Sequence, residues 1–367
     1  MTATVIVQPI ATALSPQSEE GHAVRLGGSL VYASRFAAIV REEGRVVERH
    51  TFGVRDAMQT LAPLGREAEE QWANLARQHK PLALGERRIR LDQPQIMGIL
   101  NITPDSFSDA GSFMDDPDAQ REQAAAMIEA GAAIIDVGGE STRPGAKALW
   151  EGDEIDRVVP AIEAVAGMGA AVSIDTRKAA VMEAALDAGA HLVNDVSGLA
   201  HDPRSAEVVA RAGCPVVLMH APGAAGDDLH EGADYDSVVF EVFDALRARR
   251  DAALEAGIEA RNILLDPGIG FGKSLAHNLA LINALPLFHA LGHPLLLGAS
   301  RKRMIGALSK EAPVEDRLGG SVALALEGMR AGLQLLRVHD VAETVQARNV
   351  WRGLRDAALT DFADLPG

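Results

Sequence analysis

Eight short apolar segments recur along the last three quarters of the chain, and this repeat restricts the fold more than any other feature. Each segment is four to six residues long and consists mainly of Val, Ile, Leu and Ala, which is typical of buried strands. A strand that is apolar throughout has both faces covered, as in parallel sheets flanked by helices. The segments are 96–101, 132–137, 171–175, 191–196, 215–219, 263–266, 294–299 and 334–338.

Amphipathic stretches between these segments predict helices, for example 118–131, 177–189 and 316–332. Each of these three ends in Ala-Gly before the next apolar segment, which is a common helix stop. We expect an α/β fold in which residues 93–367 form a TIM (β/α)8 barrel, because about 275 residues is close to the ~250 typical of that fold. An open doubly wound sheet is the alternative, although it does not naturally give eight equivalent repeats.

Residues 1–92 lie ahead of the repeat and predict an N-terminal α+β extension of unknown role. The segment 36–52 alternates loosely around Glu43-Gly44, which indicates a β-hairpin. The segment 65–79 carries apolar residues at helical spacing. Because no group of His, Asp, Cys or Gly suggests chemistry here, a packing or oligomerisation element is favoured.

The formal net charge is −16, from 51 acidic and 35 basic residues. This balance argues against a nucleic-acid or anionic-membrane partner, and any site for an anion must be locally basic. The single cysteine, Cys214, excludes an intrachain disulfide and precedes an apolar run, so a buried structural thiol is favoured over a nucleophile. The N-terminus shows neither a signal peptide nor a stretch long enough to cross a bilayer, and a cytoplasmic location is therefore expected.

Polar or charged residues follow nearly every predicted strand. In a parallel barrel the carboxyl ends of the strands meet at one rim, where active sites lie. A single Asp or Asn after a strand is often only a helix cap, but eight such positions are harder to explain that way. In chain order these residues are Asn101, Asp136, Asp175, Asn194 with Asp195, His220, Asp266, Ser300 with Arg301 and Lys302, and Arg337 with His339.

One group of these residues favours a polyanion. Strands eight, one and two are neighbours in a closed barrel, and they bring Arg337, His339, Asn101, Thr142 and Arg143 together. Guanidinium, imidazole and neutral donors suit phosphate oxygens, and the Asn101 amide could bind Mg²⁺ together with substrate phosphates. The alternative for Arg337 is a salt bridge to a rim carboxylate such as Asp340. We favour the anion site, because the spacing puts Arg337 and His339 on one face of the strand end.

A second group accepts hydrogen bonds. Asp175, Asn194 and Asp266 bring two carboxylates and an amide, and Lys302 adds one cation. A ligand with a guanidine-like edge would suit this group, since a carboxylate accepts two parallel N–H donors. The alternative, a buried ion pair of Lys302 with Asp175 or Asp266, is compatible with that interpretation. Asp195 is favoured as a cap, and His220 could be either structural or part of the site.

The stretch 267–274, PGIGFGKS, invites comparison with a phosphate-binding P-loop. Pro267 occupies the position of the first glycine in that motif, which weakens the match. We favour a glycine-rich turn that lets the backbone approach a flat ligand, with Phe271 covering it.

From residue 95 to about 350 the chain resembles dihydropteroate synthase, an enzyme of folate synthesis. The matching stretches are MGILNITPDSFSD, IIDVGGESTRPGA, SIDTRK, LVNDVSG, LMH, LLDPGIGFGK, GASRKRMIG and LLRVHDV, in the family's order. The resemblance implies condensation of 6-hydroxymethyl-7,8-dihydropterin pyrophosphate with 4-aminobenzoate to give 7,8-dihydropteroate and pyrophosphate, with Mg²⁺ and in a homodimer.

The resemblance also implies roles for individual residues. The pterin would contact Asp175, Asn194, Asp266, Lys302 and Phe271, and Asn101 would bind the metal. The pyrophosphate would contact Thr142, Arg143, Arg337 and His339. The aminobenzoate would lie against Phe107, Pro144 and Arg303, the last replacing a serine of some members. The catalytic set would be Arg143, Lys302, Arg337 and His339.

Two other functions fit parts of the pattern. A pterin-dependent methyltransferase domain shares the fold and the first motif, but it needs a corrinoid partner and has no pyrophosphate to bind. A pterin- or phosphate-binding module without turnover is the other, and the presence of Arg143, Lys302, Arg337 and His339 argues against it.

Overall fold

A computed structural model of the chain describes residues 3–13, 21–103, 117–141, 148–223, 226, 230 and 232–360. Eight parallel strands form one sheet in the order β12-β11-β10-β9-β8-β7-β14-β13. A parallel bridge between Leu265 and Leu295 joins the two ends, and the Leu265 amide donates to the Pro294 carbonyl at 3.0 Å. The sheet is therefore a closed barrel, as predicted. The strands are β7 (Gln95–Asn101), β8 (Ile134–Gly138), β9 (Val172–Asp175), β10 (Leu192–Asp195), β11 (Val216–Met219), β12 (Ile263–Asp266), β13 (Leu296–Leu297) and β14 (Leu335–Val338).

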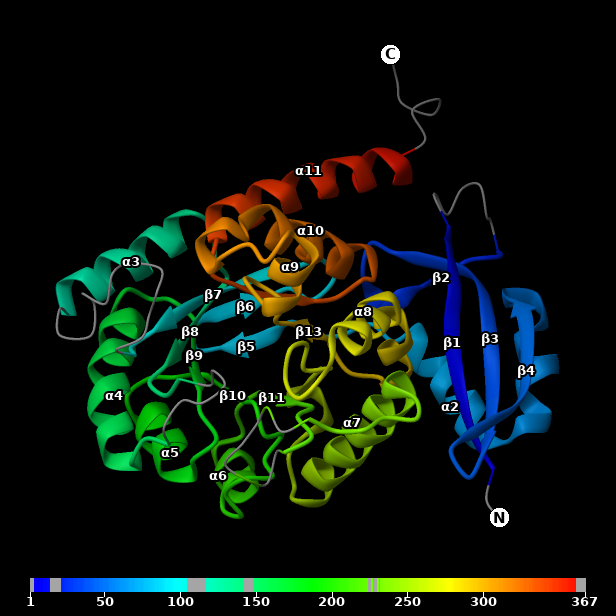
Figure 1. The fold of residues 1–367 in the computed structure, drawn as a ribbon, viewed down its shortest axis with the longest axis horizontal. Coiled ribbons are helices and arrows are strands. Elements are labelled where there is room, and N and C mark those ends of the chain that lie inside the picture. The colour runs from blue at the N-terminus through cyan, green and yellow to red at the C-terminus, as the bar shows by residue number, and fades with distance from the viewer. Residues whose placement is uncertain are drawn as a thin grey trace.

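Helices follow the strands around the outside of the barrel (Figure 1). The three helices that the sequence predicts all form, as α3, α5 and α10. Gly131, Gly189 and Gly332 come two residues after them and have positive φ, as a glycine helix stop requires. The barrel helices are α3 (Pro117–Glu129), α4 (Glu151–Gly167), α5 (Ala179–Asp187), α6 (Ser205–Ala212), α7 (Val238–Glu255), α8 (Leu275–Asn283), α9 (Arg303–Leu308), α10 (Leu318–Arg330) and α11 (Val341–Leu359).

Alternate residues of each strand face the barrel interior and the helices. The inward positions nearest the strand starts are apolar and form one buried cluster: Met97, Ile134, Ala171, Leu192, Val217, Leu264, Leu296 and Leu335. Two residues further along several of these strands the inward side chains are polar, including Asp136, Ser173, Asn194, Asp266 and Arg337. The interior thus changes from an apolar layer to a polar layer along the barrel axis.

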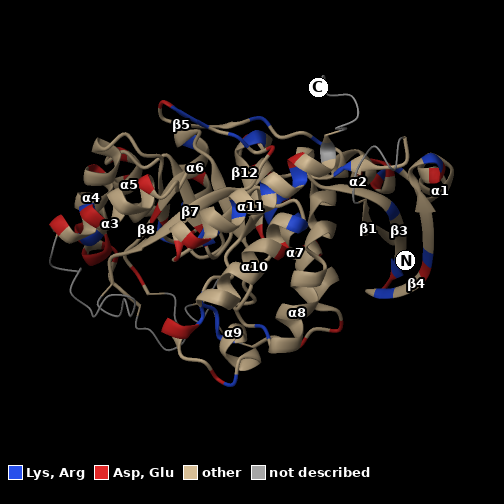
Figure 2. Ribbon diagram, turned by 90° about the horizontal axis from the view of Figure 1, so that it is seen from above, with Lys and Arg blue, Asp and Glu red and all other residues tan. Residues whose placement is uncertain are grey.

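A short antiparallel hairpin covers the apolar end. Strands β5 (Leu82–Leu84) and β6 (Arg87–Ile89) supply Leu82, Leu84 and Ile89, which join the apolar layer in one cluster. In Figure 2, β5 lies at one end of the barrel and α9 at the opposite end. Water is therefore excluded from the start of the strands, and the open end is the one at which the polar residues lie.

The N-terminal segment forms a separate antiparallel sheet, which contains the predicted hairpin and two further strands. Strands β1 (Thr4–Ala13), β3 (Tyr32–Glu42), β4 (Arg45–Gly53) and β2 (Val24–Arg25) pair around β3. The predicted hairpin turns at Glu43 and Gly44, whose positive φ values of 49° and 79° suit a two-residue turn. The predicted helix forms as α2 (Arg66–Leu75), after the short α1 (Ala57–Leu61).

Helix α2 covers the open edge of β1 through one buried side chain. The Gln71 amide accepts from the Val7 amide and donates to the Val5 carbonyl, both at 2.8 Å. These bonds replace those that another strand would make, so this edge is not available for pairing with a further strand.

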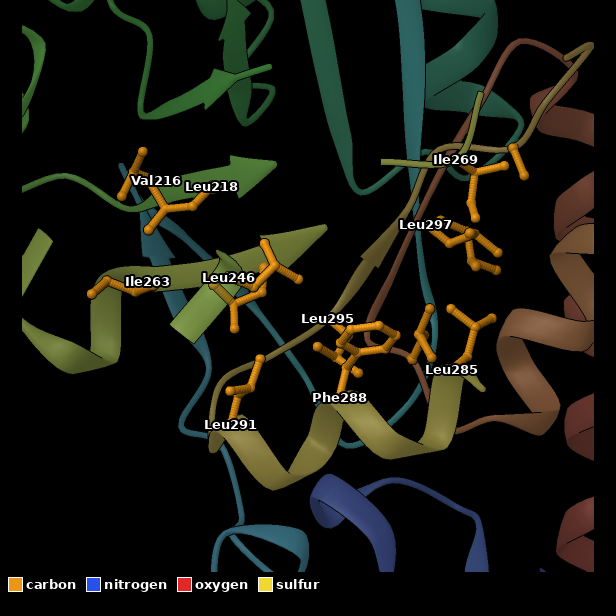
Figure 3. Packing of buried hydrophobic residues seen from close by; sticks show 14 of the residues in the cluster. Val216, Leu218, Leu246, Ile263, Ile269, Leu285, Phe288, Leu291, Leu295 and Leu297 are labelled. Carbon is orange, nitrogen blue, oxygen red and sulfur yellow. The ribbon is translucent and has the colours of Figure 1, made fainter. Parts of the chain in front are cut away.

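The N-terminal sheet docks on the side of the barrel against α7 and the 3-10 segment η6 (Leu285–Leu291). Arg41, which is 4% exposed, pairs with Asp244 of α7 at 2.8 Å. In Figure 3, Leu285, Phe288 and Leu291 point from η6 toward Leu295 and the barrel strands. The opposite side of η6 carries His289, which lies against Gly27 of the N-terminal segment. The division of the chain at residues 92 and 93 stays a prediction.

Within the described part of the chain, no helix is both long and apolar enough to span a membrane.

Two buried histidines of this region make stability depend on pH. His289 and His293 are 1% and 4% exposed, and burial lowers the pKa of each to about 4. The unfolded chain therefore binds more protons below pH 6.5, and these histidines destabilise the fold as pH falls toward 4. Buried carboxylates with raised pKa values act in the opposite direction, so the useful quantity is a difference between variants.

We expect the free energy of unfolding of the wild type to fall relative to that of His289→Gln by about 2 kcal/mol between pH 7.5 and 5. Urea denaturation at the two pH values measures this difference. The exposed His50→Gln variant is the control and should track the wild type. Identical pH dependence of wild type and His289→Gln would contradict the assignment.

Candidate functional site

A cavity of about 1050 Å³ opens at the polar end of the barrel. Six of the residues predicted for the site line it, and they come from four different strands or the segments that follow them: Asn101, Asp175, Lys302, Arg303, Arg337 and His339. Asn194 and Asp266 are almost fully buried, at 4% and 5% exposed, on strands beside these. The expectation that one mouth collects these residues is therefore met. Phe107, Thr142, Arg143 and Pro144 lie outside the described residues.

The sorting into two groups suggested that Arg337 lies apart from the acidic residues, but the structure places it in contact with two of them. Its Nε donates to Asp136 Oδ2 at 2.6 Å, and a terminal nitrogen donates to Asp175 Oδ2 at 2.5 Å. The alternative considered for Arg337, a salt bridge to a rim carboxylate, is therefore found, although the partners are Asp136 and Asp175. Asp340 instead pairs with Arg301. The cationic and acidic groups thus meet in the centre of the barrel, because β14 directs Arg337 inward across the interior rather than toward its own rim.

The charges of this pair are tightly coupled. Burial opposes the charge on Arg337, but Asp136 and Asp175 together raise its pKa, so the guanidinium stays protonated. Burial also raises the pKa of Asp175, and Arg337 opposes that change. A buried ion pair is stable only when both partners are satisfied, and removing one partner typically destabilises a protein by about 3–5 kcal/mol. Arg337 therefore needs a carboxylate or another anion beside it at all times.

The second group lies deeper in the barrel. The Asn194 side chain donates to Asp136 at 3.1 Å, and Asp266 accepts from the Gly268 amide at 2.7 Å. Burial raises the pKa of Asp266 to about 6, opposed by that backbone hydrogen bond and by Lys302. Burial lowers the pKa of Lys302 to about 8. Both groups therefore change charge within two pH units of neutrality, which is common at functional sites.

Lys302 does not form the buried ion pair considered as an alternative. Among the described residues its ammonium has no carboxylate within salt-bridge distance, and it lies 4.0 Å from the centroid of the Phe271 ring. Phe271 is 6% exposed and is also stacked with His230 at 5.1 Å between ring centroids. Phe271 thus holds the lysine through a cation–π contact. Whether it also covers a ligand stays a prediction.

The glycine-rich turn before α8 is held by its own lysine. Lys273 Nζ donates to the carbonyls of Gly268, Phe271 and His220 at 2.8, 3.1 and 3.2 Å. A P-loop lysine would instead point its ammonium at phosphate. This geometry favours the glycine-rich turn over a nucleotide site. Gly268 is required there, because a Cβ would lie 1.9 Å from the His220 carbonyl oxygen.

The sequence predicts that Asp195 is a cap, and it leaves His220 as either structural or part of the site. Both make structural contacts. Asp195 accepts from the Ser197 amide and hydroxyl, both at 2.7 Å, and from the Leu199 amide at 3.0 Å, so it caps the turn after β10 as predicted. His220 is 9% exposed, and burial lowers its pKa to about 3. Its ring is therefore neutral and packs near Tyr235, with 6.4 Å between ring centroids.

His339 is oriented by the preceding strand end. Its Nδ1 and its backbone amide both contact the Ser300 hydroxyl, at 3.0 and 3.2 Å. The neighbouring Arg301–Asp340 ion pair joins the same two loops. The imidazole at the cavity wall is thus fixed by residues that follow β13.

Sequence reasoning missed a buried charge network beside the cavity. Lys178 pairs with Glu154 at 2.6 Å and with Glu140 at 3.1 Å, and Thr176 donates to Glu154 at 2.7 Å. Arg177 lies 3.5 Å from Glu140. The network ties the segment after β8 to the segment after β9. The motifs GGEST and DTRK contain Glu140, Arg177 and Lys178, and Glu154 lies outside both on α4, so nothing in their spacing reveals the pairing.

Asn101 lines the cavity, and its side-chain oxygen lies beside Gly138 of the next strand, 3.5 Å from where a Cβ would be, which is an ordinary contact distance. Its role as a metal ligand stays a prediction. Among the described residues no group of three His, Cys, Asp or Glu side chains could hold a metal. A site with one protein oxygen, completed by substrate phosphates and water, is the kind that Mg²⁺ uses.

Comparison with known proteins identifies the family. The model of the pterin binding enzyme family matches residues 97–339. The dihydropteroate synthase of Bacillus subtilis is 43% identical over 265 residues, which are 72% of this chain and 88% of the relative. A bifunctional folylpolyglutamate synthase/dihydropteroate synthase of Haloferax volcanii is 49% identical over 265 residues, and this chain spans only 31% of that protein.

Solved structures give the same result. Xanthomonas albilineans dihydropteroate synthase with 4-aminobenzoic acid is 44% identical, with a TM-score of 0.70, and the match covers 78% of this chain and all of that one. The same enzyme in complex with 7,8-dihydropteroate gives 41% identity and a TM-score of 0.67 over the same shares. The family match begins at residue 97, after the N-terminal sheet and the hairpin β5–β6. The chain belongs to the dihydropteroate synthase family of pterin-binding transferases.

Proposed function

We propose that this chain condenses 6-hydroxymethyl-7,8-dihydropterin pyrophosphate with 4-aminobenzoate to give 7,8-dihydropteroate and pyrophosphate. The observation that carries the proposal is the convergence of Arg337, His339, Asp175 and Lys302 on one cavity at the open end of the barrel. This arrangement supports a substrate with an anionic end and a flat, nitrogen-rich end. The relatives and solved structures named above carry the name dihydropteroate synthase, which favours the synthase over the methyltransferase and over a module without turnover.

The pterin is assigned to the deeper group. Asp266 and Asp175 would accept from its guanidine-like edge, Asn194 would hydrogen-bond the ring, and Lys302 would donate to a carbonyl or ring nitrogen. The raised pKa values of the two carboxylates support this assignment, because a buried carboxylate gains most from a ligand that brings N–H donors. Phe271 would contribute to the pocket through its neighbour Lys302.

The pyrophosphate is assigned to Arg337 and His339, together with Thr142 and Arg143. The bond between the methylene carbon and the pyrophosphate oxygen breaks, and the arylamine nitrogen bonds to that carbon and later loses a proton. The protein's task is to stabilise the departing anion, which preorganised cations do well in a site that excludes water. No general base is required, because an arylamine attacks as the neutral amine.

The aminobenzoate is assigned to the outer part of the cavity, with Phe107, Pro144 and Arg303. Arg303 is exposed and lines the cavity, which supports a role for its charge opposite the benzoate carboxylate.

Mg²⁺ is part of the proposal, with Asn101 as its protein ligand. When bound, the ion would neutralise charge on the pyrophosphate. A homodimer is also proposed, and the exposed apolar side chains of Leu318, Val350 and Leu354 on α10 and α11 support it. A cytoplasmic location completes the proposal, and the single buried thiol of Cys214 is compatible with it.

The first test measures pyrophosphate release from the dihydropterin substrate with and without 4-aminobenzoate. We expect release to depend on the arylamine, and Arg337→Ala to lower kcat by about 10²–10³-fold, because a donor to the departing anion is lost. Pterin binding, followed by calorimetry, should survive in that variant.

The control is Arg330→Ala, which removes an exposed arginine of α10. It should keep wild-type turnover. Release that does not depend on the arylamine would argue against the synthase, and wild-type turnover in Arg337→Ala would remove the anion-site assignment.

The second test follows kcat/KM for the dihydropterin substrate as a function of pH. Asp266 must be ionised to accept, so activity should fall below about pH 6. Lys302 must be protonated to donate, so activity should also fall above about pH 8. Lys302→Arg should remove the alkaline limb and keep the acid limb, since a guanidinium does not titrate in this range. An unchanged alkaline limb in Lys302→Arg would show that another group produces it.

A further inference from the structure

Asp136 is a fully buried carboxylate that contacts both halves of the site. It lies on β8, is 0% exposed, and faces the barrel interior one layer below the cavity. Its Oδ2 accepts from Arg337 Nε at 2.6 Å and from the Asn194 amide at 3.1 Å. Its Oδ1 is buried and has no hydrogen-bond partner among the described residues.

The proposed function gives Asp136 no task. It assigns the pyrophosphate to Arg337 and the pterin to Asn194, and Asp136 joins these two residues from below without lining the cavity. A carboxylate directly above the apolar layer, with Ile134 as the preceding inward residue, is costly to bury unless a positive charge neutralises it. Asp136 and Arg337 therefore stabilise each other in these buried positions.

The other end of Arg337 is bound differently. Its terminal nitrogen contacts Asp175, which lines the cavity and is the carboxylate proposed to receive the pterin. The arginine side chain and the guanidine-like edge of a pterin offer the same kind of N–H donors. The two groups therefore compete for one carboxylate, whereas nothing in the proposed function competes for Asp136.

We infer that Asp136 is a positioning residue that acts as a pivot for Arg337. When a pterin takes Asp175, the terminal nitrogens of Arg337 are released from it, while Nε stays on Asp136. The guanidinium then remains at the barrel mouth with free donors for the pyrophosphate. This inference rests on the proposed function and adds to it the residue that couples the two substrate ends.

A double-mutant cycle tests the pivot. Steady-state kinetics and product inhibition by pyrophosphate are measured for the wild type, Asp136→Asn, Arg337→Lys and the double variant. Asp136→Asn keeps the size of the side chain and removes its charge. We expect it to lower kcat roughly tenfold to a hundredfold and to weaken pyrophosphate inhibition about tenfold, with KM for aminobenzoate little changed.

A lysine has one nitrogen and cannot contact Asp136 and Asp175 as the two ends of a guanidinium do. In the Arg337→Lys background, adding Asp136→Asn should therefore reduce kcat no further. If Asp136→Asn alone fails to fold, the double variant still tests the pivot, because both partners of the ion pair are then replaced. In that case the kcat of the double variant must equal the kcat of Arg337→Lys.

Ser173→Ala is the matched control. Ser173 is the direct neighbour of Asp136 in the register of β8 and β9, is equally buried, and its hydroxyl has no partner among the described residues. Its kinetics should match those of the wild type. The pivot would be overturned if Asp136→Asn kept wild-type kinetics. It would also be overturned if the double variant lost kcat by the product of the two single reductions. If pyrophosphate release by the wild type did not depend on the arylamine, the proposed function itself would be overturned instead.

Discussion

The buried contacts of Arg337 with Asp136 and Asp175 determine how the open end of this barrel is organised. They place one guanidinium between two carboxylates in the polar layer, directly above the apolar layer of the barrel interior. In such surroundings charges interact strongly and an unpaired charge is strongly destabilising. The arginine is consequently fixed in the centre of the mouth, within reach of both the deep polar pocket and the outer cavity. The side chains of Asn194, Lys302 and His339 are arranged around this central group.

The remainder of the chain keeps the two ends of the barrel different. The β5–β6 hairpin closes the apolar end with leucine and isoleucine side chains, so the polar layer is open to solvent in one direction only. The N-terminal sheet packs on the outer side of the barrel, against η6 and α7, and none of its described residues lines the cavity. Its aromatic cluster of Phe36, Phe52 and Trp72 holds its own strands and helix together, and its Arg41–Asp244 ion pair joins it to the barrel. Its described contacts are those of a structural support and not of a substrate pocket.

The sequence predicted the fold well, because eight fully apolar segments allow few arrangements. It also predicted six of the residues that line the cavity, since the carboxyl ends of parallel strands share one rim. It did not predict the partners of those residues. For Arg337 it favoured the anion site over a salt bridge with a rim carboxylate, and the pairing with Asp136 and Asp175 depends on side chains crossing the barrel interior, which no local pattern records. The role of Lys273 was similarly hidden, because a lysine that binds three backbone carbonyls and a lysine that binds phosphate follow the same glycine-rich turn. The Glu140–Lys178–Glu154 network was not predicted for the same reason, because its members are separated in sequence and are close only in the folded barrel.

The central claim is that one carboxylate, Asp175, is shared between Arg337 and the pterin, so that binding at the two ends of the site is coupled. The most direct measurement is calorimetric titration of pyrophosphate into the protein, alone and saturated with 6-hydroxymethyl-7,8-dihydropterin that carries no pyrophosphate. Coupling between two ligands is reciprocal, so titration in the other order must give the same factor. The account predicts that pyrophosphate binds about tenfold more tightly when the pterin is present, which corresponds to about 1.4 kcal/mol. Equal affinity with and without the pterin would show that Arg337 is not released by it, and would contradict the account.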